Sequence, residues 1–260
     1  MASHICIKPR YRAPILLFSL VILLLTSIEV VMAEDLPFLS ADSRIDESHW
    51  YIPDGWTNGI HQSCEWRKSA LSVLNKSLVL TLSDRGGKVR PIGCPAIQYR
   101  KMTGFGRYEA RLRTAAGSGL NTAFFTYAGP PDQGPVHDEI DFEFIGKQPD
   151  TVDITVWTDG KASPAIRVPL GYDASRGFHN YAIEWLADAV RFYADDTLIH
   201  ETKKGDPIPS HPGYLYFSLW SGSEIEDAWM GHFVYKAPVA AQVEWAKYTP
   251  ILKKQKDYHE

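Results

Sequence analysis

Short runs of alternating apolar and polar residues recur along most of the chain, and turn-forming residues separate them. In residues 106–113, for example, Tyr108, Ala110 and Leu112 alternate with charged side chains. This period of two is typical of β-strands with one buried face, and Asp195-Asp196 predicts a hairpin turn. Many short strands at this spacing predict an all-β sandwich. The predicted strands span residues 78–82, 106–113, 122–127, 139–145, 153–157, 180–185, 190–193, 198–201, 214–220 and 241–247.

The segment from His137 to Gly146 combines this strand pattern with a concentration of acids. Glu139, Asp141 and Glu143 alternate with apolar residues, so they share one face of the predicted strand. Like charges on one face repel each other, and folding alone gives little reason to place them there. Three interpretations stay open from these residues alone: a solvated surface, a site for a hard cation such as calcium, or a catalytic group. Paired carboxylates with separated pKa values are the catalytic groups of glycoside hydrolysis.

The beginning of the chain has the features of a secretory signal peptide. Basic residues precede an apolar segment, residues 15–28, and Val31-Met32-Ala33 predicts cleavage after Ala33. The alternative is an uncleaved membrane anchor, although the apolar segment is shorter than the roughly 20 residues that span a bilayer. We therefore expect a secreted protein, extracellular or periplasmic. The expected organisation is a signal peptide over residues 1–33 and one domain over residues 34–260, with a flexible tail at residues 251–260.

The charge balance bears on the partners of this protein. The formal net charge is −4, and without residues 1–33 the chain keeps 24 basic and 30 acidic side chains, a net of −6. Nucleic-acid binding requires a basic surface, so this balance argues against nucleic acid as a partner. No second hydrophobic run follows the signal, and we expect a monomer that does not contact the membrane after cleavage.

Two cysteines remain after removal of the signal peptide, which contains Cys6. Cys64 and Cys94 form the one pair left, and an oxidising compartment favours their bridging. The alternative is two free, buried thiols.

Aromatic residues are the natural candidates for sugar binding, because pyranose rings present apolar faces that pack on aromatic rings. A curved sheet would offer them a groove. Each aromatic side chain is at least as well explained by burial in the core. Phe125 and Tyr127 would share one strand face, so they would line a groove together or not at all. The candidates are Trp56, Phe125, Tyr127, Trp157, Trp220 and Trp229.

These residues carry a resemblance to glycoside hydrolase family 16. Glu139-Ile-Asp-Phe-Glu143 is similar to the E-x-D-x-E signature of that family, and the likeness extends from about Asp54 to Thr249. Within the family, the chain resembles bacterial lichenases and, above all, the secreted ExoK-type endo-1,3-1,4-β-glycanases of rhizobia, which trim acidic exopolysaccharide. The segments that carry the likeness are residues 54–59, 64–66, 104–111, 115–130, 137–143, 170–175, 178–182, 218–220 and 227–231.

The resemblance implies a concanavalin A-like, jelly-roll β-sandwich with a concave substrate cleft. It implies a retaining double displacement in which Glu139 is the nucleophile, Glu143 is the general acid/base, and Asp141 holds the nucleophile. It also implies a disulfide between the positions of Cys64 and Cys94. The residues expected to bind substrate are Asn58, Phe125, Tyr127, His137, Trp157 and Trp220.

Several positions depart from the lichenase pattern. Cys94 is followed by Pro-Ala-Ile-Gln, so the acid that binds a glucose hydroxyl in lichenases is missing. His137 replaces a tryptophan, and Ser218 replaces an asparagine. Thr155 and Trp157 stand where lichenases use Asn and Tyr. Loss of the acid removes one repulsion against an acidic polymer, which predicts a succinoglycan-type exopolysaccharide as substrate in place of simple mixed-linkage glucan.

The resemblance leaves two other functions open. The motif around His137 is also similar to that of plant xyloglucan transglycosylases, which transfer the glycosyl group to another sugar, and a sandwich of this kind can be a non-catalytic lectin. The acidic triplet argues for hydrolysis, because a pure binder would not need it. No cofactor is required. The family often holds a structural calcium ion, and Glu244 stands where its acidic ligand is usually Asp.

Overall fold

The computed structural model describes residues 32–39, 43–130, 134 and 136–251, and all of them from Met32 onward belong to one compact unit. The predicted signal peptide lies outside the described residues except for Met32 and Ala33, as does the predicted tail beyond Ile251. Within the described part of the chain, no helix is long and apolar enough to cross a membrane.

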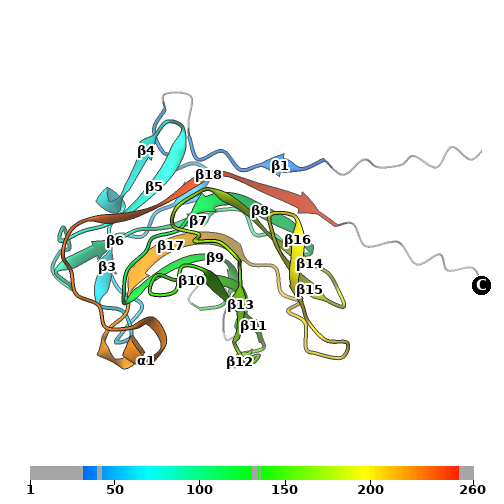
Figure 1. The fold of residues 1–260 in the computed structure, drawn as a ribbon. Helices are drawn as coiled ribbons and strands as arrows, with labels where there is room; N and C mark the ends of the chain where they lie inside the picture. The colour runs from blue at the N-terminus through cyan, green and yellow to red at the C-terminus, as the bar shows by residue number, and fades with distance from the viewer. Residues whose placement is uncertain (1–31, 40–42, 131–133, 135, 252–260) are drawn as a thin grey trace, which may run out of the picture. The chain divides into compact units, whose positions relative to one another are not determined.

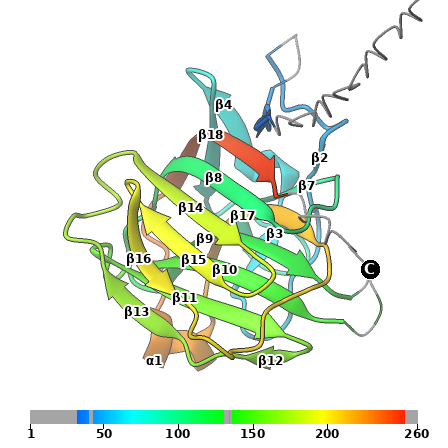
Figure 2. The same ribbon diagram turned by 90° about the vertical axis from the view of Figure 1, so that its right-hand side faces the viewer.

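The described residues form a jelly-roll β-sandwich of two antiparallel sheets, as predicted (Figure 1). The first sheet has the strand order β16-β15-β14-β8-β18-β5-β4, and a short strand, β1, pairs with the C-terminal part of β18. Figure 2 shows β8, β14, β15 and β16 of this sheet side by side. Its strands are β1 (Glu34–Asp35), β4 (Leu71–Leu74), β5 (Ser77–Leu82), β8 (Gly106–Arg113), β14 (His179–Trp185), β15 (Val190–Ala194), β16 (Thr197–Glu201) and β18 (Val239–Pro250).

The second sheet carries the acidic segment. Its strand order is β12-β11-β10-β9-β17-β7-β2, and β13 pairs with β11 beside β12. Its strands are β2 (Trp50–Tyr51), β7 (Ala96–Tyr99), β9 (Leu120–Ala128), β10 (Asp138–Ile145), β11 (Thr151–Thr158), β12 (Lys161–Ala162), β13 (Ile166–Pro169) and β17 (Tyr214–Ser221). The remaining elements are the parallel pair β3 (Cys64–Trp66) and β6 (Ile92–Cys94), the 3-10 helices η1 (Lys68–Ala70) and η2 (Glu224–Glu226), and the helix α1 (Asp227–Met230).

Every strand predicted from the hydrophobic pattern is present, and the strands missed by the prediction are short or lack alternation. β7, for instance, is buried at all of its positions and shows no period of two. The hairpin turn is also confirmed: Asp195 and Asp196 join β15 to β16 with φ values of 45° and 63°. Two successive residues with positive φ match the right-handed twist of a hairpin.

The core lies between the two sheets and is rich in aromatic rings. In β10, Ile140, Phe142 and Phe144 point inward and are buried. The Phe142 ring meets Phe192 of the first sheet edge-on, with centroids 5.1 Å apart. Because side chains alternate along a strand, this anchoring of the apolar residues forces the acids of β10 onto the opposite face.

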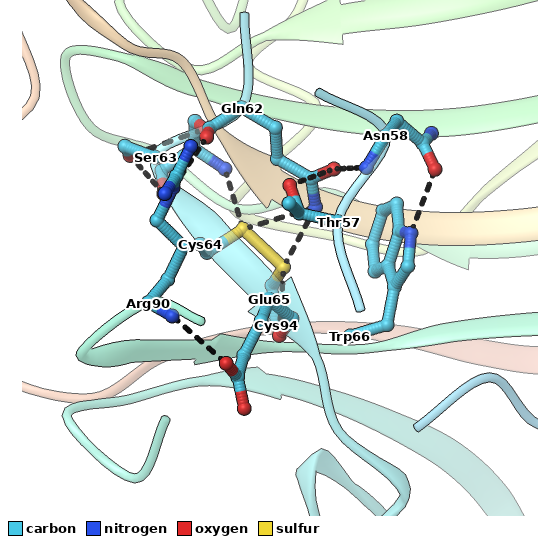
Figure 3. Close-up of a disulfide and its surroundings, with 10 residues drawn as sticks. Thr57, Asn58, Gln62, Ser63, Cys64, Glu65, Trp66, Arg90 and Cys94 are labelled. Carbon is cyan, nitrogen blue, oxygen red and sulfur yellow. Dashed lines mark hydrogen bonds between the residues drawn. A yellow bond between two sulfur atoms is a disulfide. The ribbon is translucent and has the colours of Figure 1, made fainter. Parts of the chain in front are cut away.

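A disulfide joins β3 to β6, as predicted, with the two Cα atoms 5.8 Å apart (Figure 3). Gln62 lies against it, because its Nε2 donates to Cys94 Sγ at 3.1 Å while its Oε1 accepts from the backbone N–H of Asn58. Beside it, the buried carboxylate of Glu65 accepts hydrogen bonds from the backbone N–H groups of Val89 and Arg90. The bridge therefore fixes both the loop before β3 and the loop before β6.

Removing this bridge should lower the free energy of unfolding. The two cysteines are 30 residues apart, and closure of a loop of that length stabilises by about 3–4 kcal/mol on the chain-entropy model. We expect the double substitution Cys64→Ser and Cys94→Ser to lower the denaturant midpoint accordingly in equilibrium unfolding. The wild-type protein in reductant is the control and should match the variant. Equal midpoints for the oxidised wild type and the variant would contradict the expected contribution.

Candidate active site

The outward face of the second sheet brings the three acids of β10 into register with side chains of the neighbouring strands. We call this face, defined by Glu139, Asp141 and Glu143 and the residues opposite them, the acidic face. Residues directly opposite each other in an antiparallel pair project from the same side of the sheet. Glu139 lies between Tyr127 and Trp157, Asp141 between Phe125 and Thr155, and Glu143 between Ala123 and Asp153.

Asp141 is the most enclosed of the three acids. Its side chain is buried and forms a hydrogen bond with Glu139. Burial raises the pKa of the Asp141 carboxyl well above its usual value, and the charges of Glu139 and Glu143 raise it further. A protonated Asp141 can donate this hydrogen bond, which leaves the negative charge of the pair on Glu139.

Glu143 retains its proton at neutral pH. Burial is the largest cause that raises its pKa, which reaches about 8, and nearby negative charges act in the same direction. Asn121 opposes them, because its Nδ2 donates a hydrogen bond to Glu143 Oε1 at 2.8 Å. The acidic face therefore holds one carboxyl group suited to donate a proton, four residues along the same strand from Glu139.

His137 caps the other end of the acidic triplet. Its Nε2 lies 2.9 Å from Glu139 Oε2, and this hydrogen bond is the main cause that raises the pKa of the His137 imidazole. The ring stacks on Trp157 with centroids 4.5 Å apart and meets Tyr127 edge-on at 5.5 Å. The resemblance implied substrate contacts at His137, Tyr127 and Trp157, and the structure places these three rings together beside Glu139. The hydrogen bond to Glu139 was not predicted.

A second ionic group lies on the Glu143 side and was missed in the sequence. Asp153 is directly opposite Glu143 and is buried. Arg167 of β13 donates to both of its oxygens, at 2.6 and 2.7 Å, and Trp229 Nε1 donates at 2.8 Å. The sequence did contain an indication of this position. Asp153, Thr155 and Trp157 are two residues apart in a predicted strand, so their side chains lie on one face.

Two of the remaining aromatic candidates, Phe125 and Trp220, lie on the acidic face. Phe125 stacks on Tyr216 of β17 with ring centroids 4.9 Å apart. Trp220 lies in the row beyond Glu143. Its ring centroid is 6.2 Å from that of Trp229 and 5.9 Å from that of His61. These rings are partly exposed, which fits the surface role predicted for Phe125 and Trp220 rather than the core alternative. Trp56, in the loop before β3, is 44 % exposed.

Asn58 lies in the loop held by the disulfide. Its side chain is exposed, and its Oδ1 accepts a hydrogen bond from Trp66 Nε1 at 2.9 Å (Figure 3). The loop is tied to the end of β17, because Ser63 donates to Ser221 through both its backbone N–H and its hydroxyl. This connection brings Asn58 to the end of the sheet at which Trp220 lies.

Two of the positions that depart from the lichenase pattern, Ala96 and Ser218, lie in the row of Glu143 across the sheet. From one strand to the next, this row contains Ala96 of β7, Ser218 of β17, Ala123 of β9 and Glu143 of β10. The side chains between Ala96 and Glu143 are therefore small. Thr155 occupies the next row, beside Asp141. The substitutions thus lie on the acidic face itself, as the resemblance implied.

Among the described residues, one group of side chains has the spacing of metal ligands. Asp138, Asp159 and His211 offer ligand atoms within 4.8 Å of one another. Asp138 is already satisfied, because it accepts from the backbone N–H groups of Asp159, Ser210 and His211 and hydrogen-bonds the His211 ring. Glu244 pairs with Arg111 at 2.6 Å, and a guanidinium at this distance disfavours a dication, so the residues present do not fit the calcium site of the family.

Comparison with known proteins gives one consistent answer. The profile of glycosyl hydrolases family 16 matches residues 58–247. The chain is 40 % identical over 212 residues to the endo-1,3-1,4-beta-glycanase ExoK of Rhizobium meliloti, covering 82 % of this chain and 77 % of that protein. A solved beta-glucanase of Bacillus licheniformis is 30 % identical with a TM-score of 0.76, covering 84 % and 98 %. A solved lichenase from a mouse hindgut metagenome is 30 % identical with a TM-score of 0.77, covering 85 % and 99 %. With the acids aligned on one face of a jelly-roll sandwich and the family profile matched over most of its length, the chain belongs to glycoside hydrolase family 16 and is a glycoside hydrolase.

Proposed function

We propose that the protein is a secreted, retaining endo-β-glycanase that cleaves internal β-glucosidic bonds by double displacement on the acidic face. Glu139 is the nucleophile, Glu143 is the general acid/base, and Asp141 holds Glu139. The observation that carries this assignment is the placement of three acids on one face of β10, where the buried Asp141 hydrogen-bonds Glu139 and Asn121 donates to Glu143. Burial raises the pKa of Glu143 to about 8, which suits a group that must donate a proton.

The two steps use these groups in turn. Glu143 donates its proton to the glycosidic oxygen while a carboxylate oxygen of Glu139 attacks the anomeric carbon, so the bond to the leaving sugar breaks and a glycosyl ester forms. The ionised Glu143 then removes a proton from water. The resulting hydroxide equivalent attacks the anomeric carbon, the ester bond breaks, and both carboxyl groups return to their starting states.

The partner is a polysaccharide, and we infer that its backbone is a β-glucan. Relatives at 30–40 % identity are named for β-glucanase or endo-1,3-1,4-β-glycanase activity. Aromatic rings on both sides of the acids, at Trp157 and Trp220, would pack on sugar faces, with Phe125, Tyr127, His137 and Asn58 as further contacts. For the substrate in the cell we propose an acidic, succinoglycan-type exopolysaccharide, because Ala96 removes an acid from the row of Glu143.

The decisive assay measures release of reducing ends by the mature protein on succinoglycan-type polymer and on lichenan, with Glu139→Gln as the blank. Release from the acidic polymer that disappears in Glu139→Gln is the expected result. Release from lichenan alone would replace the exopolysaccharide with mixed-linkage glucan. Activity on neither polymer, together with glycosyl transfer to an added oligosaccharide acceptor, would overturn hydrolysis in favour of transglycosylation.

Export and a monomeric state belong to the same proposal, and the disulfide supports an oxidising compartment.

Ala96→Glu tests the preference for an acidic polymer. A new carboxylate at this position would stand in the row of Glu143, separated from it by the small side chains of Ser218 and Ala123. We expect kcat/KM on the acidic polymer to fall roughly tenfold relative to lichenan, because like charges repel across a partly desolvated face. Ala96→Gln is the matched control, since it adds the same volume without the charge. If both variants show the same ratio of activities, charge at this position does not set the preference.

A further inference from the structure

Among the described residues of β9, Asn121 is the one whose side chain hydrogen-bonds an acidic side chain of β10. It lies one row beyond Ala123, opposite Ile145 of β10 and Trp220 of β17, and its side chain projects from the acidic face. The residue is completely buried, and its Nδ2 donates to Glu143 Oε1 at 2.8 Å. Diagonal neighbours on paired strands are within reach of such side chains.

The other end of the same amide has no partner among the described protein groups. Asn121 Oδ1 is buried and accepts no hydrogen bond. A buried acceptor without a donor is costly, so native proteins rarely keep one without a role. The amide therefore keeps an unpaired acceptor in order to place its donor on Glu143, which points to a role for that hydrogen bond.

One orientation of the amide serves both protonation states that Glu143 needs. When Glu143 is a carboxylate, Oε1 accepts the hydrogen bond from Nδ2. When Glu143 is a carboxylic acid ready to donate, its proton is on Oε2 and Oε1 is a carbonyl oxygen, which still accepts from Nδ2.

We propose that Asn121 is the positioning residue of the acid/base: its Nδ2 donates to Glu143 Oε1 in both protonation states, which keeps the catalytic proton on Oε2, toward the glycosidic oxygen. The proposal rests on the role assigned to Glu143. Asn121 does not touch the reacting atoms. It holds the Glu143 carboxyl group in one orientation while the proton leaves for the glycosidic oxygen and returns from water.

The charges around Glu143 give the proposal a measurable direction. Glu139 and Asp141 on β10, Asp153 on β11 and Glu226 on η2 are the acids that face or surround it, and Arg167 pairs with Asp153. Glu139, Asp153 and Glu226 each raise the pKa of Glu143, whereas the hydrogen bond from Asn121 lowers it. Loss of that bond should therefore move the pKa of Glu143 to a higher value.

The test is Asn121→Leu, which keeps the number and branching of the side-chain heavy atoms and removes both polar ends of the amide. On polysaccharide we expect kcat/KM to fall roughly tenfold or more, with KM nearly unchanged, and the basic limb of its pH profile to move to higher pH. On a dinitrophenyl β-glycoside of a short gluco-oligosaccharide, kcat/KM should stay near the wild-type value, because this leaving group needs no proton. On the same substrate, the kcat of Asn121→Leu should fall, because deglycosylation still needs Glu143 as the base.

Thr114→Val is the matched control for removal of a buried oxygen that lacks a partner. Thr114 follows β8, outside the second sheet, and its Oγ1 is also buried without a hydrogen bond. This variant should keep wild-type kinetics. Asn121→Asp provides a second variant of equal shape, whose added acid should also move the basic limb upward.

The outcomes separate this proposal from the function on which it rests. An unchanged pH profile, or equal losses of kcat/KM on both substrates in Asn121→Leu and in Asn121→Asp, would show a purely structural role and overturn the proposal. A wild-type protein that is inactive on every β-glucan, or one that keeps its activity in Glu143→Ala, would instead refute the role of Glu143 itself.

Discussion

Glu139→Ala is expected to lower kcat/KM on polysaccharide by a factor on the order of 10⁵, the scale seen when a covalent nucleophile is removed from an enzyme. Without the Glu139 carboxylate, no glycosyl ester can form, and water has no activated path to the anomeric carbon from that side. The first measurement is reducing-end release with a large excess of enzyme. Circular dichroism checks that the variant remains folded, because the substitution also removes the hydrogen-bond partner of His137 and Asp141.

The small cavity left by this substitution permits a sharper test of the role of Glu139. Azide added with an activated β-glycoside should enter the cavity and attack the anomeric carbon from the face that Glu139 occupied. The product is then an α-glycosyl azide, with inverted configuration. A β-glycosyl azide from Glu139→Ala would show that the two glutamates have been assigned in the wrong order.

Glu143→Ala is expected to lower kcat/KM on polysaccharide by about 10²–10⁴, the usual contribution of a positioned general acid. The loss on a dinitrophenyl glycoside should be much smaller in kcat/KM, because that leaving group departs without a proton. Azide should restore turnover by attacking the glycosyl ester on Glu139 and should give the β-glycosyl azide, with retained configuration. Comparable losses on both substrates would contradict the role of Glu143 as the acid.

The pH profile follows from the same residue. Glu143 must carry its proton in the free enzyme, and its pKa is raised to about 8, so kcat/KM should fall as the pH rises through this value. The sign is that of a required acid: activity is present below the pKa and is lost above it. On the dinitrophenyl substrate, whose leaving group needs no proton, this limb should be absent from kcat/KM of the wild type. Persistence of the limb would assign it to another group, such as His137, whose pKa is raised by its hydrogen bond to Glu139.

Much of the sandwich and its acidic strand could be predicted because strand geometry is local. An alternation of acids with Ile140, Phe142 and Phe144 fixes which side chains share a face, whatever the neighbouring strands are. The same argument paired Phe125 with Tyr127, and both lie on the acidic face. The short strands β3, β6 and β7 could not be predicted, since three or four buried residues contain no period.

The sequence by itself determined that Glu139, Asp141 and Glu143 share one face, since the alternation within five residues of one strand is enough to decide it. Only the tertiary structure decided what surrounds them. Asn121 and Asp153 reach Glu143 from two other strands, and Arg167 reaches Asp153 from a third. Their positions depend on the registers of β9, β11 and β13, which the packing of the whole sandwich sets. The pKa of Glu143 depends on burial and on these neighbours together, so it is a property of the folded sheet and cannot be read from the motif.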